Sequence, residues 1–176
     1  MSTRSALLAA ATFLWLAAAA GAAETPRLGK PIAPEDIAAW DITIGPDGAG
    51  LPPGSGTAKE GEAVYAAKCL ACHGEKGAGK PFDALVGGKD TLAAPSAPVR
   101  TVGSYWPYAT TLFDYVRRAM PFAETKSLSN DELYAVTAYV LHLNGIAGDS
   151  EAMNAATLPK VAMPNRDGFV PFKRGN

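Results

Sequence analysis

Apolar residues recur at intervals of three and four along three segments of the chain. This spacing is typical of an amphipathic α-helix, and the predicted helices run from 57 to 69, from 111 to 119 and from 129 to 144. No alternating strand and helix pattern accompanies them, so the sequence predicts an all-α fold. The apolar residues at these intervals are Val64, Tyr65, Leu112, Phe113, Val116, Leu133, Val136, Tyr139, Val140 and Leu143.

The first and last helices have clear start signals. Thr57 with Glu60, and Ser129 with Glu132, each fit a capping box, in which the two side chains satisfy backbone N–H groups at the helix start. The pair Asn144-Gly145 is a typical end for the last helix. These local signals fix both helices more firmly than the middle one.

Gly61 lies inside the first predicted helix, where glycine costs about 1 kcal/mol relative to alanine. A close helix crossing explains this residue better than chance does. Tyr139 lies on the apolar face of the last helix, so we expect these two helices to cross near Gly61.

Outside the helices the chain is rich in turn-forming residues, with 18 Gly and 14 Pro in total. The segment 24–56 is predicted to be an extended N-terminal arm with one helical turn at 34–40, and 147–176 a C-terminal tail that docks on a partner. The long irregular region 85–110 is typical of a segment that lines a binding site. Several apolar residues of the arm pack either on the domain or on a partner subunit, and the sequence leaves both open: Ile32, Ile37, Trp40, Ile42 and Ile44.

The N-terminus contains Arg4, an apolar run from Ala6 to Ala20, and small residues at 21–23. This pattern indicates a secretory signal peptide over 1–23, cleaved after Ala22 or Ala23. The alternative is an uncleaved membrane anchor, for which the run is short. We therefore expect an exported protein, periplasmic in a bacterium, with no membrane span in its mature form.

The charges nearly balance, with 16 Lys and Arg against 17 Asp and Glu. Such a chain has no basic field for nucleic acid, so no nucleic-acid partner is expected.

The stretch Cys69-Leu70-Ala71-Cys72-His73 has the spacing that attaches a c-type haem. Two cysteines three apart on a helical turn reach the two vinyl groups of a porphyrin, and His73 then supplies an axial imidazole. A thioredoxin-like redox motif would need a βαβ pattern around the two cysteines, and none is visible. A zinc site would need four ligands, but the chain has no further cysteine and only one other histidine, His142. A plain disulfide or a chance match remains the alternative.

Met120 is the candidate for the second axial ligand, because Pro121 stops the middle helix there and lets the side chain leave it. The carbonyl of Pro81 is the predicted acceptor for the other ring nitrogen of His73. The indole of Trp106 either donates to a haem propionate or fills core beside the porphyrin. Arg117 and Arg118 face the propionates or a partner, or are a solvated pair.

Together, Gly61, Tyr65, the motif at 69–73, Pro81, Met120-Pro121 and the helix of Tyr139 resemble the class I cytochrome c family over residues 57–146. The resemblance implies the class I cytochrome c fold, with irregular N- and C-terminal extensions. It also implies one covalently bound haem c, held by Cys69, Cys72, His73 and Met120.

Four further stretches resemble the cytochrome subunits of sulfite and sulfane dehydrogenases of the sulfur-oxidation system: 34–41, 51–56, 108–122 and 163–169. In that family the catalytic partner carries a molybdenum cofactor. Some of its cytochrome subunits hold two haems, whereas one motif here implies a monohaem form. The match includes both extensions, which favours packing against a partner for them.

With both axial positions filled, no open site remains for a substrate, so the protein is expected to carry single electrons and not to be an enzyme itself. The resemblance implies that it accepts electrons from a molybdenum-containing dehydrogenase subunit and passes them to a downstream cytochrome c or the respiratory chain. Two alternatives remain: a free electron shuttle of another respiratory pathway, and a small haem enzyme or sensor with a labile sixth ligand.

Overall fold

The computed structural model describes residues 28–38, 40–94 and 97–171. The predicted signal peptide, 1–23, lies outside these ranges. The chain divides into two units, Met1–Trp40 and Asp41–Asn176. The described part of the predicted arm therefore contributes to both units.

Among the described residues of the first unit, Pro34–Ala38 form the short helix α2, which begins at a proline as the sequence predicts. Ile32 and Ile37 are exposed by 60 % and 42 %. The described residues of this unit thus display apolar side chains on their surface.

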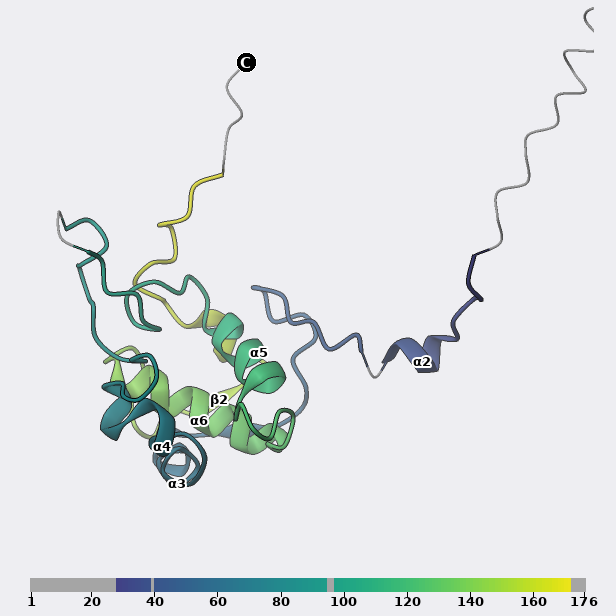
Figure 1. The fold of residues 1–176 in the computed structure, drawn as a ribbon, viewed down its shortest axis with the longest axis horizontal. Coiled ribbons are helices and arrows are strands. Elements are labelled where there is room, and N and C mark those ends of the chain that lie inside the picture. Colours follow the sequence, from purple (N-terminus) through teal and green to yellow (C-terminus); the bar gives the residue numbers. More distant parts are fainter. Residues whose placement is uncertain (1–27, 39, 95–96, 172–176) are drawn as a thin grey trace, which may run out of the picture. The chain divides into compact units, whose positions relative to one another are not determined.

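The second unit is built from helices, which confirms the expected all-α class, and it adds one pair of two-residue strands (Figure 1). Between η1 and α5 the described residues form turns and irregular backbone, which confirms the predicted irregular region up to residue 108; α5 begins at Ala109, two residues before the predicted start at Thr111. The elements in chain order are β1 (Ser55–Gly56), α3 (Ala58–Lys68), α4 (Leu70–His73), the 3-10 turn η1 (Glu75–Gly77), α5 (Ala109–Ala119), α6 (Asn130–Leu143), β2 (Met153–Asn154) and the 3-10 turn η2 (Leu158–Lys160).

Both predicted capping boxes form. The backbone N–H of Thr57 donates to the Glu60 carboxylate at 2.8 Å, and that of Ser129 donates to Glu132 at 2.8 Å. Each hydroxyl in turn accepts from the backbone N–H of its glutamate, at 3.3 Å in both boxes. These bonds satisfy donors that a helix start leaves unpaired, so they fix where α3 and α6 begin.

The helices α3 and α6 cross closely at Gly61, as predicted. A Cβ atom built there would collide with the carbonyl oxygen of Ala135 and would lie 2.9 Å from the Cβ of Tyr139. One turn further along, the rings of Tyr65 and Tyr139 are in contact, with centroids 5.3 Å apart. The crossing therefore fixes the N-terminal part of α3, and the cysteine motif follows the C-terminal end of the same helix.

The core surrounds α6, most of whose side chains are buried. Phe113 of α5 packs against Tyr134 of α6 with ring centroids 4.5 Å apart. The Tyr134 hydroxyl donates to the carbonyl of Pro52 at 2.8 Å, so the ring also fastens the segment before α3. This arrangement holds α3, α5 and α6 as one body.

The segments flanking the helical core also pack on it. The strands β1 and β2 pair antiparallel, with Ser55 opposite Asn154 and Gly56 opposite Met153. Ile44 joins the hydrophobic core, which answers the open question for this residue in favour of packing on the domain. Beyond α6, the tail is anchored by three buried side chains: Met153, Leu158 and Met163.

Within the residues that the structure describes, no helix combines the length and the apolarity needed to cross a membrane.

Candidate functional site: the Cys69–His73 turn and its surroundings

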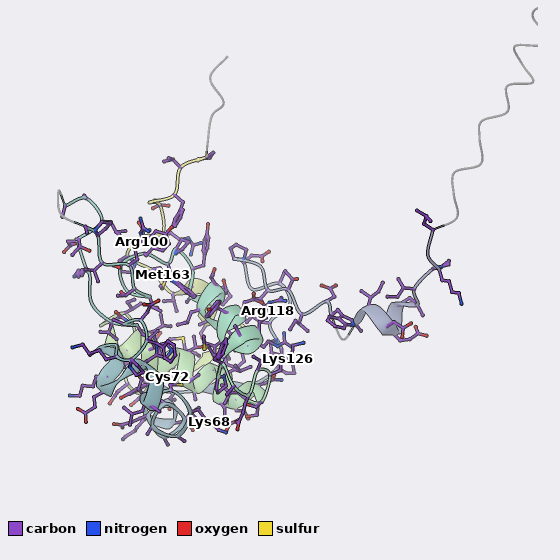
Figure 2. All side chains as sticks on the ribbon, in the orientation of Figure 1. Lys68, Cys72, Arg100, Arg118, Lys126 and Met163 are labelled. Carbon is purple, nitrogen blue, oxygen red and sulfur yellow. The ribbon has the colours of Figure 1, made fainter. Side chains whose placement is uncertain are left out.

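The cysteine motif lies at the junction of α3 and α4. Cys69 ends α3 and begins α4, and its carbonyl accepts from the backbone N–H groups of Cys72 at 3.1 Å and His73 at 2.9 Å. This helical turn places residues 69 and 72 on one face. The two cysteines do not form a disulfide with each other; Cys69 is half-buried, and Cys72, labelled in Figure 2, is exposed.

The two thiols differ in their surroundings. Burial raises the pKa of Cys69 to about 11, and the neighbouring Cys72 adds to this shift. Cys69 is therefore a neutral thiol at neutral pH, packed against the hydrophobic core. The Cys72 side chain is exposed to solvent.

The imidazole of His73 is oriented by a backbone carbonyl. Its Nδ1 lies 2.8 Å from the carbonyl oxygen of Asp83, and since a carbonyl only accepts, Nδ1 carries the proton. The predicted acceptor, the carbonyl of Pro81, is thus wrong. The reason is the backbone of Phe82, whose N–H donates to the Cys72 carbonyl at 3.0 Å and brings Asp83 to the ring. The second ring nitrogen, Nε2, keeps its lone pair for a ligand.

The glycine-rich loop after His73 folds back on the motif. Gly74 has φ +72°, and a Cβ there would collide with the carbonyl of Gly79. The hydroxyl of Tyr65 donates to the Gly74 carbonyl at 2.8 Å, and the N–H of Gly79 donates to the His73 carbonyl at 2.8 Å. Burial raises the pKa of Tyr65, so this donor stays protonated well into the alkaline range.

Met120 lies where the sequence predicts, directly after α5. Its φ of −123° and ψ of 147° are extended, so its side chain leaves the helical path, and the residue is half-buried. The other described candidates differ: Met153 and Met163 are buried in the core, and His142 is exposed. Nothing in these placements removes Met120 as the candidate ligand.

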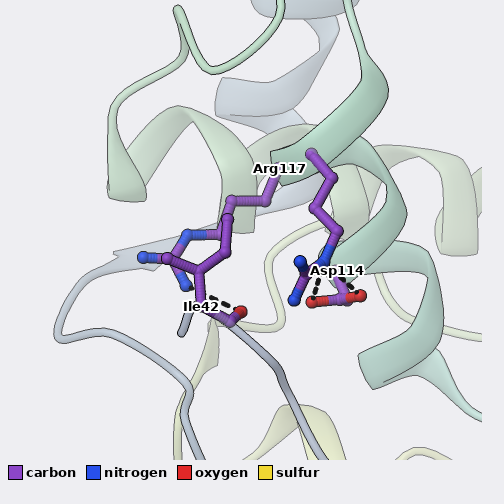
Figure 3. Close-up of polar contacts among 4 residues, drawn as sticks. Ile42, Asp114 and Arg117 are labelled. Carbon is purple, nitrogen blue, oxygen red and sulfur yellow. Dashed lines mark hydrogen bonds and ion pairs between the residues drawn. The ribbon is translucent and has the colours of Figure 1, made fainter. Parts of the chain in front are cut away.

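The two arginines before Met120 have separate partners (Figure 3). Arg118 donates to both oxygens of Asp114, at 2.9 and 3.0 Å, one helical turn away. Arg117 points to the backbone carbonyl of Ile42, at 3.5 Å. Neither contact was predicted from the sequence, although the i,i+4 spacing of Asp114 and Arg118 is typical of an ion pair on a helix.

Trp106 is half-buried and meets the ring of Tyr115 edge-on, at 5.6 Å between centroids. It packs against the core, as one of its two predicted roles requires. The C-terminal tail covers the same loop: Asn165 donates to the Tyr105 carbonyl at 2.6 Å, and the Arg166 guanidinium lies 4.6 Å above the Tyr108 ring. Sequence reasoning had no signal for these tail contacts.

The residues of this site fit a c-type haem by the chemistry of their donor atoms. Two thiols lie one helical turn apart, and the imidazole that follows them is already held in the tautomer that presents Nε2. The thioether of Met120 follows directly at the end of α5. Among these residues, Cys69, Cys72, His73 and Met120 are those that can hold such a group.

Comparison with protein families matched residues 56–140 to the model described as cytochrome c oxidase, cbb3-type, subunit III. Among solved structures, the sulfane dehydrogenase SoxCD from Paracoccus pantotrophus contains a similar chain, with 43 % sequence identity and a TM-score of 0.78. That match covers 85 % of this chain and 74 % of the other. A search of curated proteins gave no match.

Proposed function

Since this chain belongs to the c-type cytochromes and has the class I cytochrome c fold, we propose that it is the monohaem electron-transfer subunit of a periplasmic sulfane or sulfite dehydrogenase. Its partner would be a catalytic subunit with a molybdenum cofactor. A cytochrome c domain implies electron transfer and not catalysis, and the sulfur-oxidising partner is the part that needs a test.

The observation that carries the proposal is the extent of the similarity. The family model covers only residues 56–140, whereas the match to the sulfane dehydrogenase chain covers 85 % of this chain, at 43 % sequence identity. The similarity therefore reaches beyond the common cytochrome domain into the flanking segments. A generic electron shuttle needs no such segments, and a subunit that docks permanently has a use for them.

In this proposal each site residue has a separate task. Cys69 and Cys72 would hold a haem c through their sulfur atoms, and His73 would offer Nε2 to the iron because the Asp83 carbonyl holds its other ring nitrogen. Met120 would offer its thioether sulfur to the iron from the end of α5. Trp106 would fill core beside the haem, since its side chain packs against the hydrophobic core.

When bound, the haem would supply a one-electron couple, and ligation by a methionine and a histidine favours a high reduction potential. The chain itself would fix the ligands, bury one face and leave an edge accessible. Electrons would arrive singly from the molybdenum subunit and leave to a downstream cytochrome c or the respiratory chain.

The ligand assignment is tested by the Met120→Ala variant of the holoprotein. The ferric protein should lose its far-red thioether absorption band, and its reduction potential should fall, because the thioether no longer stabilises the reduced iron. Met163→Leu is the matched control, since Met163 is buried in the core and should leave the band intact. A band that survives in Met120→Ala rejects Met120 as the ligand.

The partner assignment is tested by purifying the tagged holoprotein from its native periplasm, measuring co-purified molybdenum and adding sulfite or a sulfane-sulfur compound. We expect molybdenum in the complex and reduction of the haem by one of these compounds. A haem that dithionite reduces, but that neither sulfur compound reduces, would favour the free-shuttle alternative.

A surface variant tests whether the extension contributes to this association. Ile37 of α2 is exposed by 42 %, so Ile37→Asp should spare the cytochrome domain while it lowers the amount of molybdenum that co-purifies. Glu35→Gln on the same helix is the control. Equal molybdenum recovery from wild type, Ile37→Asp and Glu35→Gln would contradict docking through this segment.

A further inference from the structure

The two segments that carry the proposed axial ligands are joined by an ion pair. Lys68, the last residue of α3, stands directly before Cys69, and its Nζ lies 2.9 Å from a carboxylate oxygen of Glu124. Glu124 follows Met120 in the turn after α5. The pair thus connects residues that are 56 positions apart in the chain.

The turn that contains Glu124 is exposed over residues 122–127. The backbone N–H of Glu124 donates to the Pro121 carbonyl at 2.9 Å, and the backbone N–H of Ser127 donates to the Glu124 carbonyl at 3.2 Å. Both hydrogen bonds join residues of the same turn. Phe122, next in sequence to Pro121, is exposed by 83 %. The ion pair therefore links an exposed turn to a helix end that the α3–α6 crossing holds in place.

Lys68 has a second carboxylate nearby, that of Glu132, but it is engaged elsewhere. Glu132 accepts from the N–H and the hydroxyl of Ser129, both at 2.8 Å, in the capping box of α6. Glu124 is therefore the carboxylate that bonds Lys68 directly, and this bond raises the pKa of Lys68. Lys68 is a cation throughout the neutral range.

From this geometry we propose that Lys68 and Glu124 are positioning residues, whose ion pair holds the Met120 turn against the haem-attachment side and slows the loss of the methionine ligand. The inference rests on the proposed role of Met120. Both side chains are largely exposed, by 40 % and 60 %, so the effect is modest and is screened by salt.

The test measures how fast imidazole replaces the methionine in the ferric holoprotein, because imidazole can enter only when the thioether leaves. At low ionic strength, Glu124→Gln should speed this reaction about two- to five-fold, the range expected for an exposed ion pair. In high salt, wild type and variant should react at similar rates.

Three further variants make the result specific. Lys68→Met should act like Glu124→Gln, and the double variant should be no faster than either single one, because both remove the same interaction. Asp114→Asn is the matched control: it breaks an ion pair of the same 2.9 Å length within α5, and should leave the rate unchanged.

The outcomes separate this inference from the ligand assignment. Equal rates for wild type and Glu124→Gln, or an equal acceleration by Asp114→Asn, would overturn the positioning role while the far-red band still disappears in Met120→Ala. A band that persists in Met120→Ala would overturn the ligand assignment, and the positioning role with it.

Discussion

A single methyl group at Gly61 provides a quantitative test of the helix crossing that supports the haem-attachment turn. In Gly61→Ala the new Cβ would collide with the Ala135 carbonyl and would lie 2.9 Å from the Cβ of Tyr139. Carbon atoms rest about 3.5–4.0 Å apart, so α3 and α6 must separate by roughly 1 Å at this point. The obstacle is backbone, which cannot rotate away as a side chain can.

The expected magnitude follows from two opposing effects. Overpacking a close contact costs about 1–3 kcal/mol, and the rigid partner places this site toward the upper end of that range. Alanine favours the helix over glycine, and this preference stabilises the folded protein by about 1 kcal/mol. The free energy of unfolding should therefore fall by about 1–2 kcal/mol, which corresponds to roughly 3–8 °C in melting temperature for a domain of this size.

Denaturant and thermal unfolding of the holoprotein, followed by far-ultraviolet circular dichroism, would measure this loss. Gly148→Ala is the control, because its Cβ would meet only the Glu151 Cβ, at 3.8 Å. Its melting temperature should stay close to that of wild type. If Gly61→Ala melts at or above the wild-type temperature, the crossing is looser than described and Gly61 is not required by it.

Further predictions concern hydrogen bonds and ionisation at Tyr65 and at the start of α6. Tyr65→Phe leaves the Gly74 carbonyl without its 2.8 Å donor and should cost about 1 kcal/mol in urea unfolding. Because burial raises the pKa of Tyr65, the unfolded chain ionises first, so wild-type stability should fall as the pH rises past 10; an identical fall in Tyr65→Phe would contradict this assignment. Ser129→Ala should destabilise α6 by about 1 kcal/mol. The backbone N–H of Ser129, which Ser129→Ala keeps, and the Ser129 hydroxyl both lower the pKa of Glu132, so their contribution is present above pH 4.5 and lost in acid. Ser129→Ala should therefore lose less stability in acid than wild type, by the share of the hydroxyl; an equal loss would argue against that share.

The sequence predicts the helical part of this fold because the signals are local. The capping boxes at Thr57 and Ser129, the proline after Met120 and the spacing of apolar residues all act within a few positions of one another. Even one long-range feature, the crossing at Gly61, was readable. A glycine in a helix interior is costly enough to need an explanation.

Other features had no such signal. The acceptor for His73 is a main-chain carbonyl, which every residue possesses, so side-chain identity could not distinguish Asp83 from Pro81. The contact of Arg117 with the Ile42 carbonyl is hidden for the same reason. The strands β1 and β2 have two residues each, too few for an alternating pattern.

The pairing of β1 with β2 has a consequence for protein engineering. Gly56 pairs with Met153, so the segment before α3 and the segment after α6 form one structural module. Both strands contact α6, although the two segments lie at opposite ends of the domain in sequence. A chimera that transfers only one of them to another cytochrome would leave a strand without its neighbour. Grafts between relatives should therefore exchange the two together, as they would exchange the two halves of a hairpin.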